Sequence, residues 1–421
     1  MKRRETQKRG ILKTLYTLFV IALPMISVYA SGIAGFTMGD VFLVAFFFLR
    51  IMQGIQSKNL KISQRTTPLI PLILIIPLMT ILSALMQQNV DGYSVFIRIV
   101  RRMFYYLSVV IVSDEWFDSE YGKKGIVTLG KIGSIYMFIQ YAAYYGAHVV
   151  LHGYLPFLRV YHESYSQVDY QQLYQNMFRP TSFLLEPAHI SRYLLIPLAI
   201  VLFCEDIPKR WLWAFVISAA IMASTSGTGL IAVAMIWLIW ILAGVFGFAE
   251  TKRIPAYYLA IYLLFLGAAI FALNNSVVQS ALFRITNTNL TNVNTAGGAR
   301  FRGYIRYFEL NTFGKVFGMG YGNSPDTALP TWFSGASYML YGTGFIGFMV
   351  CIIMFIRLFI KKHTLLPKVL CIILAYLFFV DDMFMSTVCV LYLSFICTWQ
   401  EKVVEAEVSD ENSISNRLLV S

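Results

Sequence analysis

Charged residues are scarce in this chain, because Asp, Glu, Lys and Arg make up 13% of 421 residues while hydrophobic residues make up 57%. A water-soluble particle of this size needs far more polar surface. The composition therefore excludes a soluble globular protein and predicts an integral membrane protein. The formal net charge of +12 does not indicate a nucleic-acid partner, since many Lys and Arg residues lie between apolar runs, where cytoplasmic anchoring explains them.

Motifs for metals, disulfides and nucleotides are also missing. The five cysteines form no CxxC pair and lie in or beside apolar runs, so neither a disulfide framework nor a zinc site is expected. Asp381 and Asp382 are adjacent, and neighbouring side chains point in different directions, which makes them weak metal ligands. The glycine-rich stretch 318–324 lacks the Gly-Lys-Ser/Thr ending of a phosphate-binding loop, and we expect a turn-forming loop over the site instead. We expect no metal and no cofactor.

Long apolar runs fill most of the chain. A bilayer core about 30 Å thick needs ~20 mostly apolar residues per helix. We predict an all-α, polytopic membrane protein with about twelve transmembrane helices, in which residues 1–400 form one transmembrane domain and residues 401–421 a disordered cytoplasmic tail. The predicted spans are residues 14–31, 35–52, 68–87, 94–112, 126–147, 188–204, 211–226, 228–247, 255–273, 334–356, 366–380 and 384–400.

The distribution of basic residues predicts the orientation. Alternating the spans from a cytoplasmic N-terminus with an uncleaved first span puts the basic clusters between spans on the cytoplasmic side, as the positive-inside rule requires. Both termini are then cytoplasmic. The sequence STSGTG at 224–229 is either a tight external turn or a re-entrant break. The basic clusters are Lys58/Lys61/Arg65, Lys123/Lys124, Lys209/Arg210, Lys252/Arg253 and Lys361/Lys362.

Two predicted external loops, residues 148–187 and 274–333, are too long to be simple connectors, so we expect function there. Four apolar or aromatic residues of the first loop recur near helical spacing, which predicts a helix lying on the membrane surface. These residues are Phe157, Tyr161, Tyr165 and Val168. The second loop contains GGARFRGYIRYFEL, followed by the glycine-rich GKVFGMGYGNSP.

Arginine is unexpectedly frequent on the side predicted to be external. Arg98, Arg101 and Arg102 follow i, i+3, i+4 spacing, so one helix face carries all three, and Arg302 and Arg306 repeat this spacing. A guanidinium offers a rigid fork of donors that matches phosphate oxygens, so these sets predict binding of a diphosphate. The alternative is headgroup anchoring or pairing with a nearby carboxylate. The candidate carboxylates are Asp91, Glu163 and Glu309.

The stretch RPTSFLLEPAHI, which begins at Arg179, combines an acid, an imidazole and a helix start. Pro187 fits the first position of a helix, which leaves Glu186 at the cap and His189 in the first turn. Glycosyl transfer to a sugar hydroxyl needs a base and cationic help for a departing diphosphate. Glu186 and His189 are the candidates for base or acceptor positioning. In the alternative interpretation, Glu186 only caps the helix and His189 pairs with it.

The order of these segments resembles the bacterial O-antigen polymerase and ligase superfamily, nearest to the Wzy-type polymerases of capsule and exopolysaccharide. The resemblance rests on the many spans, RPTSFLLEPAHI, the STSGTGL turn, GGARFRGYIRYFE and GKVFGMGYGNS, from about residue 93 to 343. It implies a GT-C-like membrane glycosyltransferase of the bacterial cytoplasmic (inner) membrane with its active site facing outside. The implied reaction is an inverting, metal-independent transfer from an undecaprenyl-diphosphate-linked oligosaccharide to a second lipid-linked repeat unit. A protein that regulates chain length is a further implied partner.

The resemblance also implies roles for individual residues. Glu186 would act as base or orient the acceptor, with Arg179 and His189 in the same pocket. The diphosphate would be bound by a set of arginines from separate segments. This set is Arg300, Arg306, Arg302, Arg98 and Arg101. One departure is that many relatives carry Ser-Arg-Thr-Gly where this chain has Ser-Gly-Thr-Gly at 226–229, so any anionic contact of that arginine must come from elsewhere or be absent.

Two alternatives stay open at this point. A surface-glycan ligase of the same superfamily would use the same scaffold and donor but a different acceptor. A lipid-linked glycan flippase or other transporter would be expected to place ionisable residues near the bilayer midplane and to show related halves. Mid-span charges are scarce here, with Asp40 a marginal exception, and the halves do not match.

Overall fold

The structure is a computed structural model that describes residues 10–58, 61–86, 92–161, 178–251, 267, 296–323 and 333–399. In these ranges the regular structure is helical apart from two isolated β-bridges, Tyr29–Val160 and Ala30–Thr37. The first half contains α1 (Ile11–Ile26), α2 (Met38–Ser57), η1 (Thr67–Leu69), α3 (Ile70–Met86), α4 (Gly92–Leu107), the π-helix η2 (Ser108–Ser113), α5 (Asp114–Trp116) and α6 (Ser119–Ala147). The second half contains α8 (Pro187–Phe203), α9 (Arg210–Ala223), α10 (Gly227–Thr251), α13 (Ala296–Phe308), α14 (Thr312–Phe317), α15 (Gly335–Ile360), α16 (Leu365–Val380), η4 (Met383–Met385) and α17 (Val388–Thr398).

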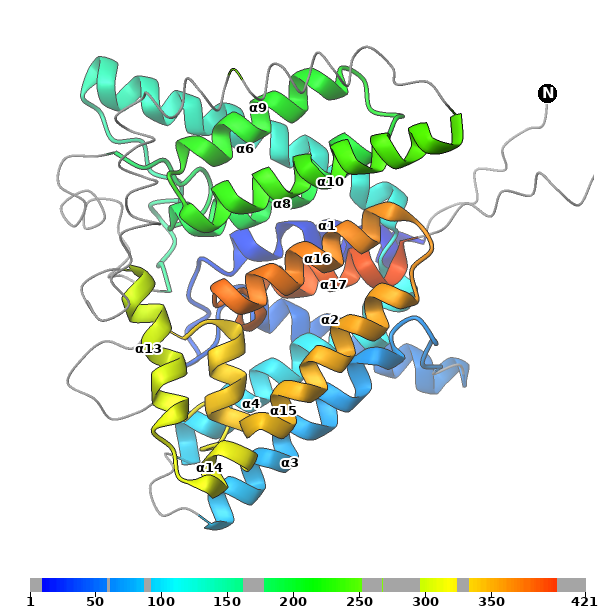
Figure 1. Cartoon of the computed structure of the whole chain (residues 1–421), viewed down its shortest axis with the longest axis vertical. Coiled ribbons are helices and arrows are strands. Elements are labelled where there is room, and N and C mark those ends of the chain that lie inside the picture. Colours follow the sequence, from blue (N-terminus) through cyan, green and yellow to red (C-terminus); the bar gives the residue numbers. More distant parts are fainter. Residues whose placement is uncertain are drawn as a thin grey trace, which may run out of the picture.

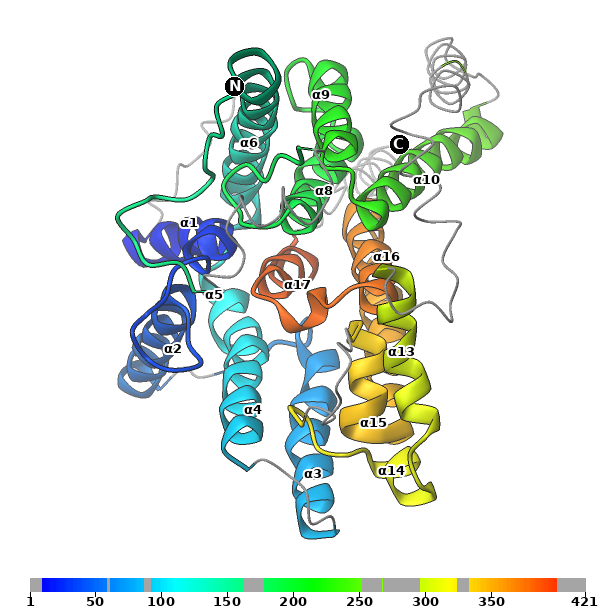
Figure 2. The same cartoon turned by 90° about the vertical axis from the view of Figure 1, so that its left-hand side faces the viewer.

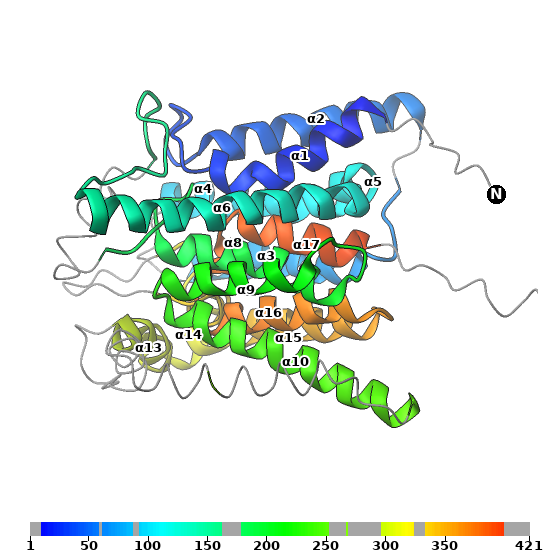
Figure 3. The same ribbon diagram turned by 90° about the horizontal axis from the view of Figure 1, so that it is seen from above.

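Most of the long helices run side by side in a single bundle (Figures 1 and 3). Seen from one end, α17 lies near the middle, with α1, α4, α8, α15 and α16 around it (Figure 2). Every residue of α17 is buried, and so are nearly all residues of α8. These two helices therefore form the centre of the protein, and the end of the bundle where α8 and α17 begin is enclosed on several sides.

The outer surface of the bundle is apolar. On α3, one stripe of large hydrophobic side chains at helical spacing is exposed: Leu74 at 64%, Leu78 at 50%, Ile81 at 57% and Leu85 at 76%. A soluble protein would carry polar residues on such an outward-facing stripe. Among the described residues, five helices are long and apolar enough to cross a membrane. They are Met38–Ser57, Thr67–Met86, Ser119–Ala147, Gly227–Gly244 and Gly335–Ile360. The all-α and multi-pass membrane predictions are confirmed at this level.

The predicted spans correspond to helices wherever the structure describes them. The largest shift is at the predicted span 126–147, where α6 begins at Ser119. The span predicted at 94–112 is formed by α4 together with the π-helix η2. The span predicted at 255–273 lies outside the described residues, apart from position 267. At 224–229 the chain makes a tight turn between α9 and α10, with Thr225 at a positive φ of 51°.

The predicted surface helix in the first long loop is wrong over its first part. Residues 157–161 are not helical, and Val160 instead forms a β-bridge with Tyr29 at the end of α1. Backbone hydrogen bonds on both sides of this bridge, Ala30 to Arg159 and Tyr161 to Val28, hold the segment in an extended conformation. Pairing with another segment outweighs local periodicity here. Tyr165 and Val168 lie outside the described residues.

The basic clusters that the structure describes gather at one end of the bundle, whereas Lys252 and Arg253 lie outside the described residues. Lys123, near the start of α6, binds Asp206 at 2.8 Å, just after the end of α8. Lys361, after the end of α15, donates to Thr67 at the start of η1 at 2.9 Å. Lys362 donates to the backbone carbonyl of Cys397 near the end of α17 at 3.4 Å. The helix ends that alternation assigns to the cytoplasm therefore lie together, as the predicted topology requires.

Candidate functional site

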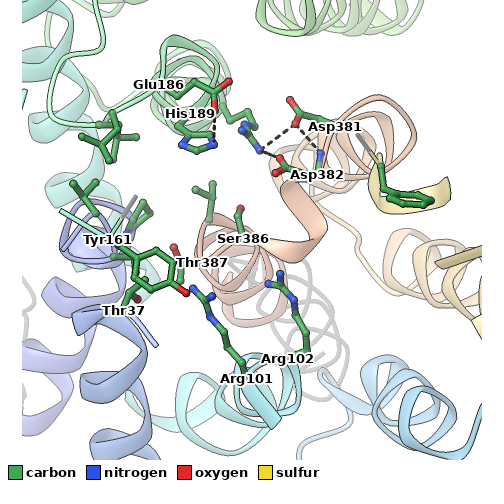
Figure 4. Close-up of a pocket in the computed structure, with 18 of the residues that line it drawn as sticks. Thr37, Arg101, Arg102, Tyr161, Glu186, His189, Asp381, Asp382, Ser386 and Thr387 are labelled. Carbon is green, nitrogen blue, oxygen red and sulfur yellow. Dashed lines mark hydrogen bonds and ion pairs between the residues drawn. The ribbon is translucent and has the colours of Figure 1, made fainter. Parts of the chain in front are cut away.

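A cavity of about 480 Å³ opens at the opposite end of the bundle from the basic clusters. It lies among the end of α1, the start of α2, α4, the start of α8, the link from α16 to α17 and the start of α15. Figure 4 shows two groups of side chains that face each other across it. We call the group on α8 and the α16–α17 link the acidic wall, defined as Glu186, His189, Arg192, Asp381 and Asp382. We call the group on α4 the α4 wall, defined as Arg101 and Arg102.

The start of α8 supplies the first part of the acidic wall. Pro187 occupies the first helical position and Glu186 the N-cap, as the sequence predicts. The Glu186 side chain makes no capping hydrogen bond. Instead its Oε2 lies 3.0 Å from Nε2 of His189, with side-chain exposures of 20% and 40%. In the alternative interpretation of the sequence, Glu186 caps the helix and pairs with His189. The Glu186–His189 pair is present and faces the cavity, whereas the side-chain cap is absent.

Glu186 is held in its charged form. Burial raises the pKa of this carboxyl, but the charge and the hydrogen bond of His189 and the nearby Arg192 outweigh burial and lower the pKa from 4.5 to about 2. The carboxylate is therefore ionised at every pH near neutrality. An acid this strong has a weak conjugate base, so Glu186 is better suited to orient a neighbour than to remove a proton itself.

Arg192, one turn beyond His189, joins α8 to the link after α16. Its Nη1 lies 2.6 Å from Asp382 Oδ1 and 3.2 Å from Asp381 Oδ1. Arg192 and Asp381 are almost fully buried, whereas 53% of the Asp382 side chain is exposed. Thr228 in the first turn of α10 donates to Asp381 Oδ2 at 3.4 Å. The expectation that the two aspartates point apart is wrong, because the shared Arg192 draws both carboxylates to one cation.

The acidic wall has more negative than positive fixed charge. Arg192 faces two carboxylates, and Glu186 adds a third. Burial raises the pKa of the Asp382 carboxyl, but Arg192 and Asp381 more than offset this effect, so the pKa is held below its ordinary range. Glu186 and Asp382 are consequently charged near neutral pH, which favours ligand groups that donate hydrogen bonds, such as sugar hydroxyls.

On the α4 wall, Arg101 is already paired. Its Nε lies 2.9 Å from Asp40 Oδ2 in the first turn of α2 and 2.9 Å from the Tyr105 hydroxyl. Asp40 also accepts hydrogen bonds from the backbone N–H of Thr37 at 2.7 Å and from the Tyr105 hydroxyl. The Arg101 guanidinium further lies over the ring of Tyr161, 5.7 Å from its centroid. Asp40 thus neutralises Arg101 and fixes its position.

Arg102 differs from its neighbour. It is half-buried, it lines the cavity, and its Nη1 atom is buried without a hydrogen-bond partner. Its guanidinium carbon lies 5.3 Å from the centroid of the Tyr105 ring. Within the described part of the chain, Arg102 forms no ion pair with a carboxylate. Its charge is therefore available to a ligand.

The structure brings together only some of the residues predicted to share a site. Glu186, His189 and Arg101 line the cavity. Arg179 does not line it, because it reaches the 224–229 turn, where Nε donates to Thr225 Oγ1 at 2.7 Å and to the Ser224 carbonyl at 3.1 Å. Arg179 therefore brings a guanidinium to this turn.

Arg98 and the arginines of α13 also lie away from the cavity lining. Arg98 donates to the carbonyl of Gly322 at 2.6 Å and so fixes the glycine-rich segment against α4. Arg306 pairs with Glu309 at 2.7 Å, as the pairing alternative predicts. Arg302 shares the helix with Arg306, and neither lines the cavity. The side chain of Arg300 lies outside the described residues, as do Asp91 and Glu163.

The sequence pattern alone does not single out Arg102, Arg192 or the two aspartates after α16. The signal for Arg102 was its adjacency to Arg101 in the arginine triplet. The signal for Asp40 was its place in an otherwise uncharged run, because a charge there requires a partner. Across the part of the chain that the structure describes, no group of three or more His, Cys, Asp or Glu side chains is arranged to hold a metal ion. All five cysteines are free thiols.

No protein-family model matches this chain, and no curated protein matches its sequence.

Proposed function

We propose that this chain is a membrane glycosyltransferase that joins lipid-linked glycan repeat units at the outer face of a bacterial cytoplasmic membrane. The supporting observation is the cavity at one end of an apolar helix bundle, where a carboxylate–imidazole pair faces guanidinium groups. Activation of the acceptor needs the carboxylate–imidazole pair, and a departing diphosphate needs the guanidinium groups. The proposal includes a GT-C-like scaffold with about twelve spans, cytoplasmic termini and an external cavity.

In the proposed reaction, an acceptor sugar hydroxyl attacks the anomeric carbon of the donor glycan. The bond from that carbon to the carrier diphosphate breaks, its electron pair leaves with the diphosphate, and the anomeric configuration inverts. The hydroxyl proton passes to the Glu186–His189 pair. We assign the base role to His189, which is the more exposed partner, and the orienting role to Glu186, whose low pKa makes it a weak base.

The substrates are two undecaprenyl-diphosphate-linked oligosaccharides, one as donor and one as acceptor. Energy comes from the activated donor, so neither a nucleotide nor a metal is part of the proposal. Arg300, Arg302 and Arg306 would attract the anionic donor as it approaches the cavity, and Arg98 and Arg179 would hold neighbouring segments in place. The acidic wall, rich in acceptors, suits the hydroxyls of an acceptor sugar.

A single assay tests this proposal. Purified protein in lipid nanodiscs is supplied with one lipid-linked repeat unit and no other acceptor, and the products are separated by gel electrophoresis. A ladder of glycan lengths is the expected result. An inert mixture that becomes active when a different lipid acceptor is added would identify a ligase instead. In sealed proteoliposomes, movement of the lipid-linked unit across the bilayer without elongation would identify a flippase and reject glycosyl transfer.

A further inference from the structure

The N-terminus of α17 opens into the cavity. Ser386, Thr387 and Val388 all line it, and Figure 4 shows Ser386 and Thr387 between the acidic wall and the α4 wall. The N-cap residue Thr387 makes no side-chain capping hydrogen bond, although α17 is 11 residues long. The first N–H groups of a helix lack partners inside the helix and carry the positive end of its dipole. The N–H groups of Cys389 and Val390 already donate to the carbonyls of Ser386 and Thr387, so this helix end offers an anionic ligand the positive end of its dipole and the Thr387 hydroxyl.

Arg102 supplies an independent observation at the same cavity. Of the three cavity-lining arginines, Arg101 is neutralised by Asp40 and Arg192 by Asp381 and Asp382. Arg102 has no carboxylate partner among the residues that the structure describes, and its buried Nη1 makes no hydrogen bond. A buried charge without a counter-ion or hydrogen-bond partner is costly. An anionic ligand in the cavity would provide both.

Arg102 and the N-terminus of α17 are independent features, because α4 and α17 are separated by about two thirds of the chain. Both helices nevertheless pack around the same cavity. The positive end of α17, the Thr387 hydroxyl and one uncompensated guanidinium then face a single space, whereas the Ser386 hydroxyl donates to the carbonyl of Met383. A diphosphate has several acceptor oxygens and more than one negative charge, and this donor set matches it better than it matches a carboxylate or a neutral sugar. The acidic wall, which lies beside these donors, would repel an anion bound closer to Glu186.

We propose that Arg102 and the N-terminus of α17 form the binding site for the diphosphate of the lipid carrier. This inference rests on the proposed function and deepens it by assigning the leaving group to one place in the cavity. The carrier diphosphate lies between the two walls, with the donor sugar directed toward His189. When the anomeric bond breaks, Arg102 and the helix end stabilise the charge that accumulates on the departing phosphate.

The test measures binding rather than turnover. Full-length protein in nanodiscs is titrated with inorganic pyrophosphate and, in parallel, with farnesyl diphosphate, and binding is followed by calorimetry. Wild-type protein is expected to bind both, and the prenyl compound more tightly if the lipid carrier is the natural source. R102Q is expected to bind pyrophosphate about 30-fold or more weakly, because a charged contact in a desolvated site is lost. R102K should recover part of the affinity, since it keeps the charge without the planar fork.

R210Q is the matched control, because Arg210 pairs with the exposed Glu205 at the basic end of the bundle. It should bind pyrophosphate like wild type. Thermal unfolding without ligand provides a second measurement. R102Q should unfold at the same temperature as wild type or higher, since it removes a half-buried charge that has no carboxylate partner among the described residues, and it should lose the stabilisation that pyrophosphate gives wild type.

Several results would overturn this site. One such result is equal pyrophosphate affinity in wild type and R102Q, and another is no binding by wild type. A third is strong destabilisation of ligand-free R102Q, because it would show that Arg102 has a structural partner. The proposed function is judged separately. Arg102-dependent binding without a glycan ladder would keep the anion site and reject glycosyl transfer, whereas a ladder with unchanged R102Q binding would reject only the site.

Discussion

The arginines on the two walls of the cavity lie in opposite electrostatic environments. On the acidic wall, Arg192 is buried and contacts two carboxylates, Asp381 at 3.2 Å and Asp382 at 2.6 Å. On the α4 wall, Arg102 is half-buried and has a nitrogen with no hydrogen-bond partner. A compensated charge fastens segments together, whereas an uncompensated charge in a cavity remains available to a ligand. The comparison therefore separates structural arginines from those that bind substrate.

The largest expected effect is the loss of Arg192. R192L leaves the buried Asp381 without its counter-ion, so we expect a loss of about 3–5 kcal/mol in the free energy of unfolding, together with low yields of folded protein. Thermal unfolding in detergent measures this change. Combining R192L with D381N should recover part of the loss, because the unpaired charge is removed. A stable R192L single variant would show that the two walls do not differ as described.

Next in size is the effect of Glu186 on turnover. E186Q keeps the shape of the side chain but no longer holds His189 through a charge, so we expect polymer formation to fall by about 10²–10⁴-fold while the protein stays folded. Quantified ladder formation gives the rate, and size-exclusion chromatography checks the fold. H189Q should cause a loss of similar size. Full activity in E186Q would remove Glu186 from the proposed reaction.

The acidic wall should also make the protein sensitive to acid. The pKa of Glu186 is lowered from 4.5 to about 2 in the folded protein, so the folded state binds this proton less readily than the unfolded chain. The resulting stabilisation is fully present above pH 4.5 and is lost as the pH falls toward 2. Wild type should therefore lose more stability than E186Q over this window in unfolding experiments. Parallel pH profiles for the two proteins would contradict the assignment.

The smallest effect is expected on α13. Arg306 and Glu309 are exposed to 29% and 52%, and such surface pairs contribute less than about 1 kcal/mol. R306Q should therefore change the free energy of unfolding by less than this amount, and it should weaken pyrophosphate binding less than R102Q does. The same calorimetric titration decides the point. A larger loss of binding in R306Q would move the main diphosphate contact from the cavity to α13.

Hydropathy was sufficient to predict the long helices of the bundle, because each is a long apolar run bounded by charge or by turn residues. It did not predict α13 and α14, which are short and lie in the predicted external loop 274–333. The start of α8 was also predictable, since Pro187 fixes the first helical position and thereby places Glu186 and His189. The central position of α17 was not, because a helix that is apolar all round looks the same whether it faces lipid or protein. Its burial becomes visible only when the other helices are packed around it.

The division of the arginines was likewise beyond local sequence reasoning. Arg101 and Arg102 are adjacent, yet only Arg101 meets Asp40, which lies more than 60 residues earlier in the chain. Arg192 meets its two carboxylates across about 190 residues. Local spacing shows which side chains share a helix face, but the partner that neutralises each one comes from long-range packing.

The most direct test of the account is an experimental structure of the full-length protein in nanodiscs with an undecaprenyl-diphosphate-linked repeat unit bound. We expect diphosphate density between Arg102 and the N-terminus of α17, with the first sugar beside His189 and the lipid chain leaving the bundle toward the membrane. Diphosphate density against α13 or at the basic end of the bundle, with the cavity empty, would contradict it.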